Sequence, residues 1–131
     1  MVSPERGAAH LTLMGLLFGG VLMLGLAVDM IRFGAAWREA AHLAATAAEA
    51  GAGWVDQSAA YRGELAIDPG LADAAARLVA GGAGHGVGTT ITGNRICVEV
   101  AIRVHPTLLA MVGAGPKMAT ATSCAEPRLV P

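Results

Sequence analysis

Apolar residues are distributed unevenly along the chain, and the densest run lies near its start. Apart from His10 and Thr12, residues 8–28 contain only Leu, Met, Gly, Phe, Val and Ala, on every side of a helix. Roughly 20 such residues span a bilayer core, whereas a soluble helix of this length usually carries a polar stripe. We therefore predict a membrane span over residues 8–28. The alternative is a helix buried within an oligomer.

The same run differs from a removable secretory signal. The apolar core of a signal is shorter, roughly 7–15 residues, and a small-residue cleavage site follows it. Here the run is longer, and Asp29 and Arg32 follow it within an unbroken helical pattern. A retained anchor therefore fits this sequence better than a cleaved signal.

The helical pattern continues past the apolar run as an alanine-rich amphipathic segment. Phe33, Trp37, Ala40, Ala44 and Ala47 recur every three or four residues, so they share one helix face. Alanine is the strongest helix former, and no proline interrupts the segment. We predict one helix over residues 8–50, about 65 Å long, of which residues 29–50 lie outside the membrane.

The end of the apolar run carries two opposite charges. Asp29 and Arg32 lie three residues apart, a spacing at which side chains meet on a helix surface. We predict that they pair with each other near the membrane boundary. Further along, Gly51 and Gly53 provide a stop for the long helix.

A second, shorter helix is predicted over residues 69–80. Asp68 is placed to cap its start, Pro69 occupies the first helical position and Gly81 follows its end. We expect its apolar side to consist of Leu71, Ala75, Leu78 and Val79. The segment before it reads as loop with a helical turn, and the glycine-rich residues 81–88 read as a flexible connector.

The remaining residues show strand alternation. Residues 89–92 and 95–104 flank the dipeptide Gly93-Asn94, which is typical of a hairpin with a two-residue turn. Pro106 begins a short helical turn, and residues 118–125 read as a third strand. We predict an α+β, pilin-like fold, in which the long helix packs on a small antiparallel sheet. The residues expected at this contact are Phe33 and Trp37 on the helix, and Val98, Val100 and Ile102 on the sheet.

Composition narrows the function. The net charge is −1 and aromatic residues make up 4%, so neither a basic field nor stacking side chains favour nucleic-acid binding. No two of the four histidines have a metal-ligand spacing, and no serine lies in a nucleophile motif. We expect no enzyme activity, no cofactor, no metal and no small-molecule substrate.

Cys97 and Cys124 are the two cysteines, and both fall on the polar side of their strands by alternation. If the two strands are neighbours, the thiols are close enough to bridge. A disulfide would imply an oxidising compartment outside the cytoplasm, whereas two free thiols would imply a reducing one. We favour the disulfide, because membrane anchoring makes export of the domain more common.

Gly15 and Gly19 form a GxxxG pattern inside the predicted span. Small residues at this spacing let two helices approach closely in lipid. Glycine is also frequent in membrane helices without such a role. We predict a helix–helix contact at these two positions.

The first half of the chain resembles the TadE/TadG-like minor pilins of tight-adherence type IV pili. The resemblance is carried by residues 5–52, ERGAAHLTLMGLLFGGVLMLGLAVDMIRFGAAWREAAHLAATAAEAGA. The shared features are Arg6-Gly7, a small-residue start, a long apolar helix, a polar residue at its end and an alanine-rich close. The second half is similar in layout, and the likeness covers most of the chain.

The resemblance implies a structural subunit in the assembly of a bacterial pilus or a related envelope machine. It implies a single-pass protein of the bacterial cytoplasmic membrane. The expected disulfide and the very short segment before the span favour the amino end inside, so residues 1–7 would be a short cytoplasmic leader and residues 51–131 a small extracytoplasmic domain. It also implies cleavage by a prepilin peptidase between Gly7 and Ala8. The partners would be membrane lipid and other pilins or pilus-assembly subunits, in a homo- or hetero-oligomer.

One position departs from the family pattern. Members usually carry glutamate five residues after the cleaved glycine, where this chain has Thr12. That glutamate is thought to neutralise the amino terminus of a neighbour in the filament. Two alternatives therefore stay open beside the filament subunit: an accessory subunit of a secretion complex that never enters a filament, and a single-pass anchor carrying a binding domain.

Overall fold

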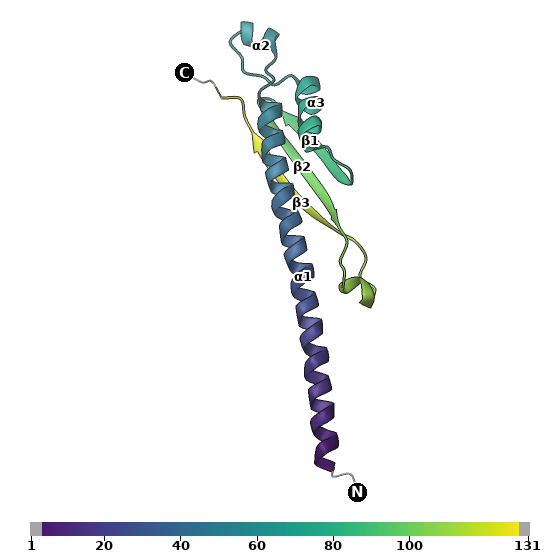
Figure 1. The fold of residues 1–131 in the computed structure, drawn as a ribbon. Coiled ribbons are helices and arrows are strands. Elements are labelled where there is room, and N and C mark those ends of the chain that lie inside the picture. The colour runs from purple at the N-terminus through teal and green to yellow at the C-terminus, as the bar shows by residue number, and fades with distance from the viewer. Residues whose placement is uncertain (1–3, 129–131) are drawn as a thin grey trace.

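A computed structural model describes residues 4–128. A long N-terminal helix packs on a three-stranded antiparallel sheet with two short helices, an α+β arrangement of pilin type, as the sequence predicts (Figure 1). The elements in chain order are α1 (Pro4–Ala52), α2 (Gln57–Tyr61), α3 (Pro69–Ala80), β1 (His85–Thr92), β2 (Arg95–Val104), the 3-10 turn η1 (Leu109–Val112) and β3 (Lys117–Ala125).

Helix α1 is one unbroken helix of 49 residues, which is about 73 Å at 1.5 Å per residue. It extends slightly beyond the predicted range at both ends. Residues 4–7 of the predicted leader belong to this helix, and residues 1–3 lie outside the described part. The later half of α1 lies along the sheet and α3, whereas the earlier half extends beyond them (Figure 1). We call the sheet, α2, α3 and the packed half of α1 the head.

The sheet has the order β1-β2-β3, with both pairs antiparallel. Its first turn is the predicted one, since Gly93 has a φ of 61° and Asn94 completes the two-residue loop. β1 is longer than predicted because it begins at His85, within the expected connector. Gly86 and Gly88 pair with Ala101 and Glu99 through their backbones. Strand pairing needs only backbone groups, so the glycines do not prevent it.

The core lies between β2, α1 and α3. Ile96, Val98 and Val100 are fully buried, and Ile102 is nearly so, as predicted for this face of β2. The helices meet the strand with small side chains, and those buried are Ala40, Ala44, Ala47, Ala48 and Ala52 on α1 and Ala72, Ala76 and Ala80 on α3. Because alanine projects so little, the helix backbones can approach the sheet and each other closely.

α1 approaches both the sheet and α3 closely near its end, at Gly51. A Cβ at this position would lie 2.5 Å from Ile96 Cδ1 and 3.1 Å from the carbonyl oxygen of Ala72. Three elements therefore converge on one residue that has no side chain. Gly51 was predicted to stop the helix, but its place in the structure is a packing position inside α1.

The two aromatic residues on α1 do not join this core, contrary to the prediction. Phe33 and Trp37 remain 39% and 51% exposed, while Ala40 and Ala44 on the same predicted face are fully buried. Along α1, the two rings lie between the buried alanines, which contact the sheet, and Asp29, which contacts the β2–β3 loop. The helix meets the sheet through its alanines because small side chains permit the closest contact.

Helix α3 also packs on a different face from the predicted one. Its cap is as expected, since the Asp68 carboxylate accepts from the amides of Gly70 at 2.9 Å and Leu71 at 3.0 Å. However, Leu71 and Leu78 are 50% and 85% exposed, whereas the alanine face is buried. Hydrophobicity alone favours the leucine face, but only the alanine face fits the narrow space beside α1.

Side-chain hydrogen bonds attach α3 to the edge strand β1. The Arg77 guanidinium donates to Asp73, with an Nε–Oδ2 distance of 2.9 Å, and the Thr89 hydroxyl also donates to Asp73. Arg77 reaches the Val87 carbonyl oxygen at 3.3 Å as well. The hydrogen bonds from Arg77 and Thr89 hold the pKa of Asp73 below its ordinary value, so the carboxylate stays charged and keeps accepting from both residues.

Candidate interaction surface

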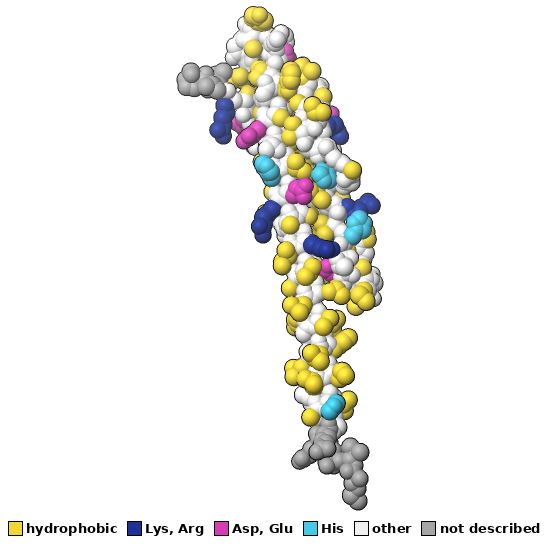
Figure 2. All heavy atoms as spheres, viewed as in Figure 1, with side chains coloured by type: hydrophobic (Ala, Val, Ile, Leu, Met, Phe, Trp, Pro, Cys, Tyr) yellow, Lys and Arg dark blue, Asp and Glu magenta, His cyan; other side chains and the backbone are white. Residues whose placement is uncertain are grey.

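The earlier half of α1 is a bare apolar rod. Its large side chains are exposed, as in Leu11 at 77% and Met23 at 73%, and Figure 2 shows hydrophobic atoms along this half below the head. In the described part of the chain, α1 is the one helix long and apolar enough to cross a membrane. The head covers almost none of that stretch, so its apolar surface is available to lipid or to other helices.

Gly15 and Gly19 lie within this bare stretch. A Cβ at either position would meet no other atom within 4 Å, apart from the helix's own neighbouring backbone. The surface around them is therefore open to a close-packing helix, and the contact predicted for them stays a prediction. Gly7 and Ala8, the predicted cleavage position, lie within the first turns of the same helix. The Thr12 hydroxyl donates to the Ala8 carbonyl oxygen at 2.8 Å.

At the border between rod and head, α1 holds the loop that connects β2 to β3. The Asp29 carboxylate accepts from three consecutive amides, those of Thr107 at 2.8 Å, Leu108 at 3.1 Å and Leu109 at 2.9 Å. Asp29 itself is only 5% exposed. Arg32, on the next turn of α1, donates to the Thr107 hydroxyl. The loop is thus fastened to the helix by two charged side chains.

This arrangement corrects the predicted role of Asp29 and Arg32. Within residues 4–128 the two side chains form no ion pair with each other; each binds the loop instead. The physical reason is that the first amides of a 3-10 turn have no partner in the turn, and a carboxylate is their strongest acceptor. The contacts join residues 75 to 80 positions apart, which helix spacing could not reveal.

One turn before Asp29, Gly25 receives the loop. Gly25 is buried, and a Cβ there would collide with the side chain of Leu108. Gly25 and Asp29 are four residues apart, so they share one helix face and form a single seat for the loop. In the sequence Gly25 reads as one more glycine of a membrane helix, and nothing local distinguishes it.

Replacing Asp29 by alanine is expected to release the β2–β3 loop while the head stays folded. The three amides of the loop lose their acceptor, and their hydrogen exchange should accelerate on the order of tenfold or more. Hydrogen–deuterium exchange of peptides covering residues 105–112 measures this. Glu39→Ala, which removes an exposed carboxylate elsewhere on α1, should leave those peptides unchanged. Equal exchange in wild type and Asp29→Ala would show that the carboxylate does not hold the loop.

Cys97 and Cys124 form a disulfide, as predicted, with an S–S distance of 2.02 Å and a Cα–Cα distance of 4.0 Å. The two residues are direct partners in the register of β2 and β3. Cys124 is exposed and Cys97 half-buried, on the sheet face opposite α1. The alternation of the strands thus placed both sulfur atoms correctly, and the register brought them together.

Two open hollows in the described residues bring polar side chains together, and the larger, of about 840 Å³, contains the Arg95–Glu126 ion pair beside Glu49. His85, His105 and Arg103 line an open hollow of about 640 Å³ beside Met118. No three His, Cys, Asp or Glu side chains within residues 4–128 lie close enough to hold a metal ion. The surface that stands out is therefore the apolar rod together with the loop fastened at its upper end.

Neither a protein-family model, nor a characterised protein, nor a solved structure matches this chain. Its function is therefore argued from its own geometry. That geometry consists of an apolar helical rod, a disulfide-linked α+β head and a loop anchored on Asp29 where the two meet.

Proposed function

We propose that this protein is a structural subunit of minor-pilin or pseudopilin type, which takes part in assembling a tight-adherence-type pilus or a related bacterial envelope machine. Residues 8–28 anchor it in the cytoplasmic membrane, and the head lies on the outer side. The observation that carries the proposal is the difference between the two halves of α1: one face of the later half packs on the sheet, whereas the earlier half is apolar and exposed on all sides.

The exposed rod supports an assembly role because so much apolar surface is costly in water. Large contiguous apolar patches on soluble monomers are rare and mark sites that lipid or partners cover. A single span with Gly15 and Gly19 on an open surface can exchange lipid contacts for helix contacts without unfolding. Such an exchange is what a subunit needs if it moves from the membrane into an assembly.

The disulfide supports placing the head outside the cytoplasm. Disulfides persist in oxidising compartments and are rare where cellular thiols keep cysteines reduced. Cys124 is exposed, so a reducing environment could reach the bridge. The head therefore belongs on the extracytoplasmic side, with the start of α1 facing the cytoplasm.

The geometry of Thr12 favours a second candidate, an accessory subunit that remains in the membrane beneath a filament. Its hydroxyl is engaged by the Ala8 carbonyl oxygen of its own helix, and threonine carries no charge that could neutralise a neighbouring amino terminus. Filament packing of the kind that uses a glutamate at this position is then unavailable. Both candidates share the anchor and the helix-to-helix mechanism.

Mass spectrometry of the mature protein from membranes tests the proposal. We expect a polypeptide that begins at Ala8 and stays in the membrane fraction through alkaline extraction. An intact start that is still membrane-embedded would favour the accessory subunit. Release of the protein by alkaline extraction would refute the anchor and both candidates with it.

Cysteine cross-linking tests the helix contact separately. Gly15→Cys and Gly19→Cys should form cross-links to a neighbouring helix in native membranes, because small residues mark the contact face. Leu17→Cys, on the opposite side of the same helix, is the matched control. Equal cross-linking at all three positions would show that the glycines do not define a contact face.

A further inference from the structure

We propose that the β2–β3 loop is a second membrane contact, with η1 lying in the interfacial region of the outer leaflet. The residues that enter it are Leu109, Met111 and Val112, which we call the apolar collar. This inference rests on the proposed anchoring of residues 8–28, and it adds that the head is held against the bilayer rather than swinging freely above it.

The depth of the loop follows from its seat on α1. Leu108 packs over Gly25, three residues before the end of the predicted span at Val28. Three residues of helix correspond to about 5 Å, so the start of η1 lies about 5 Å inside the end of the span. Interfacial elements bury their apolar side by roughly 5–10 Å. A bilayer that covers residues 8–28 therefore also reaches the collar.

The chemistry of the loop fits that depth. Met111 and Val112 are 81% and 75% exposed, and Leu109 is 36% exposed. Residues 104–116 contain no Asp, Glu, Lys or Arg. Leu24 and Leu26, the neighbours of Gly25 on α1, are also exposed. Hydrophobic atoms are visible both on the rod and on the lower end of the head beside it (Figure 2).

Several backbone amides of the loop are hydrogen-bonded within the protein, which lowers the cost of placing the loop in lipid. The amides of Thr107, Leu108 and Leu109 are bound by Asp29, and those of Met111 and Gly113 bind carbonyl oxygens of the turn. Unpaired backbone groups are costly in lipid. The single carboxylate at this level is buried and accepts three hydrogen bonds, so it is not presented to lipid.

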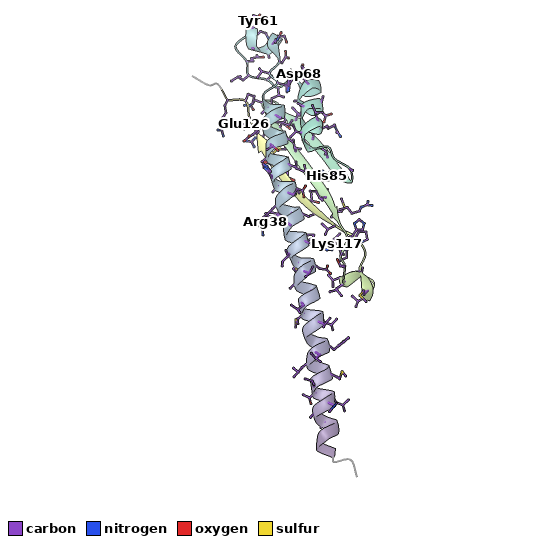
Figure 3. All side chains as sticks on the ribbon, viewed as in Figure 1. Arg38, Tyr61, Asp68, His85, Lys117 and Glu126 are labelled. Carbon is purple, nitrogen blue, oxygen red and sulfur yellow. A yellow bond between two sulfur atoms is a disulfide. The ribbon has the colours of Figure 1, made fainter. Side chains whose placement is uncertain are left out.

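Basic residues stand just above the collar. Lys117 lies where the sheet ends next to η1, and Figure 3 shows it at the opposite end of the head from Tyr61. Arg32 and Arg103 are also exposed near this border. Lys and Arg beside an apolar surface favour contact with anionic headgroups. This order, apolar below and basic above, matches a lipid interface better than a protein partner.

The depth of the collar can be measured in the full-length protein with an environment-sensitive fluorophore. Met111→Cys, Met23→Cys and Ser58→Cys are labelled one at a time, since both native cysteines are bonded to each other. The proteins are reconstituted in phosphatidylcholine–phosphatidylglycerol vesicles that contain lipids with a quencher near the headgroup or deep in the acyl chains. Met23 lies in the span, and Ser58 in α2 at the far end of the head.

We expect the label at Met111 to shift to shorter wavelengths and to be quenched most by the headgroup-proximal lipid. The label at Met23 should be quenched most by the deep lipid, and the label at Ser58 by neither. A Met111 label that behaves like the Ser58 label would overturn the inference. A blue shift at Met111 without lipid quenching, lost when the vesicles are diluted with lipid, would also overturn it, because a second copy would then cover the collar. Absence of quenching at Met23 would instead refute the anchor itself.

Discussion

Replacing Ala44 by leucine is expected to destabilise the head by about 1–3 kcal/mol, a range typical of overpacked cores. Ala44 has no exposed surface and lies in the alanine contact between α1 and the sheet. Its neighbours across the contact are the fully buried β2 side chains, which have no free volume to accept three more heavy atoms. The helix would have to move away from the sheet or force strained rotamers.

Urea unfolding of the full-length protein in detergent, followed by the near-ultraviolet signal of its tryptophans, measures this effect. Ala35→Leu is the matched control, since Ala35 is exposed on the same helix and tolerates a larger side chain. An Ala44→Leu protein as stable as the control would show that the contact is loosely packed. The closeness of α1 to the sheet would then need another explanation.

Removing the disulfide is expected to cost about 3.5 kcal/mol, because the bridge closes a loop of sequence separation 27 in the unfolded chain. The double variant Cys97→Ala/Cys124→Ala should unfold at a temperature on the order of 10 °C below the wild type. The fold itself should persist, since β2 and β3 are also joined by their ladder and both pack under α1.

Thermal unfolding with and without reductant provides the control. Reductant should lower the midpoint of the wild type to that of the double variant and leave the double variant unchanged. A wild-type midpoint that does not respond to reductant would mean that the bridge is either absent in solution or thermodynamically neutral. The second reading would also weaken the placement of the head in an oxidising compartment.

Features with local causes could be predicted from the sequence. The apolar run of residues 8–28, the Asp68 cap of α3 and the Gly93-Asn94 turn each depend on residues within a few positions of one another. The alternation of β2 placed Val98 inside and Cys97 outside, because successive side chains of a strand point to opposite faces. These patterns were sufficient for the order of elements and for the α+β class.

Which apolar face of each helix packs in the core depended on tertiary contacts. The sequence favours Leu71 and Leu78 as the packed side of α3, and Phe33 and Trp37 as part of that of α1. The structure uses alanines in both helices, since the space between α1, α3 and the sheet is too narrow for larger side chains. The distance between α1 and α3 depends on how both helices and the sheet pack together. The sequence pattern of one helix does not predict that distance.

The seat of the β2–β3 loop shows the same limit at the candidate site. Asp29 and Arg32 read as a local pair, and Gly25 as an ordinary glycine of a membrane helix. The folded chain instead brings residues 107–109 to all three, across a separation of 75 residues or more, and each of the three helps to hold the loop. The sequence by itself shows that a charged residue, Asp29, follows the apolar run. Only the tertiary structure shows what this carboxylate binds, because its partners are backbone amides, which every residue type except proline carries.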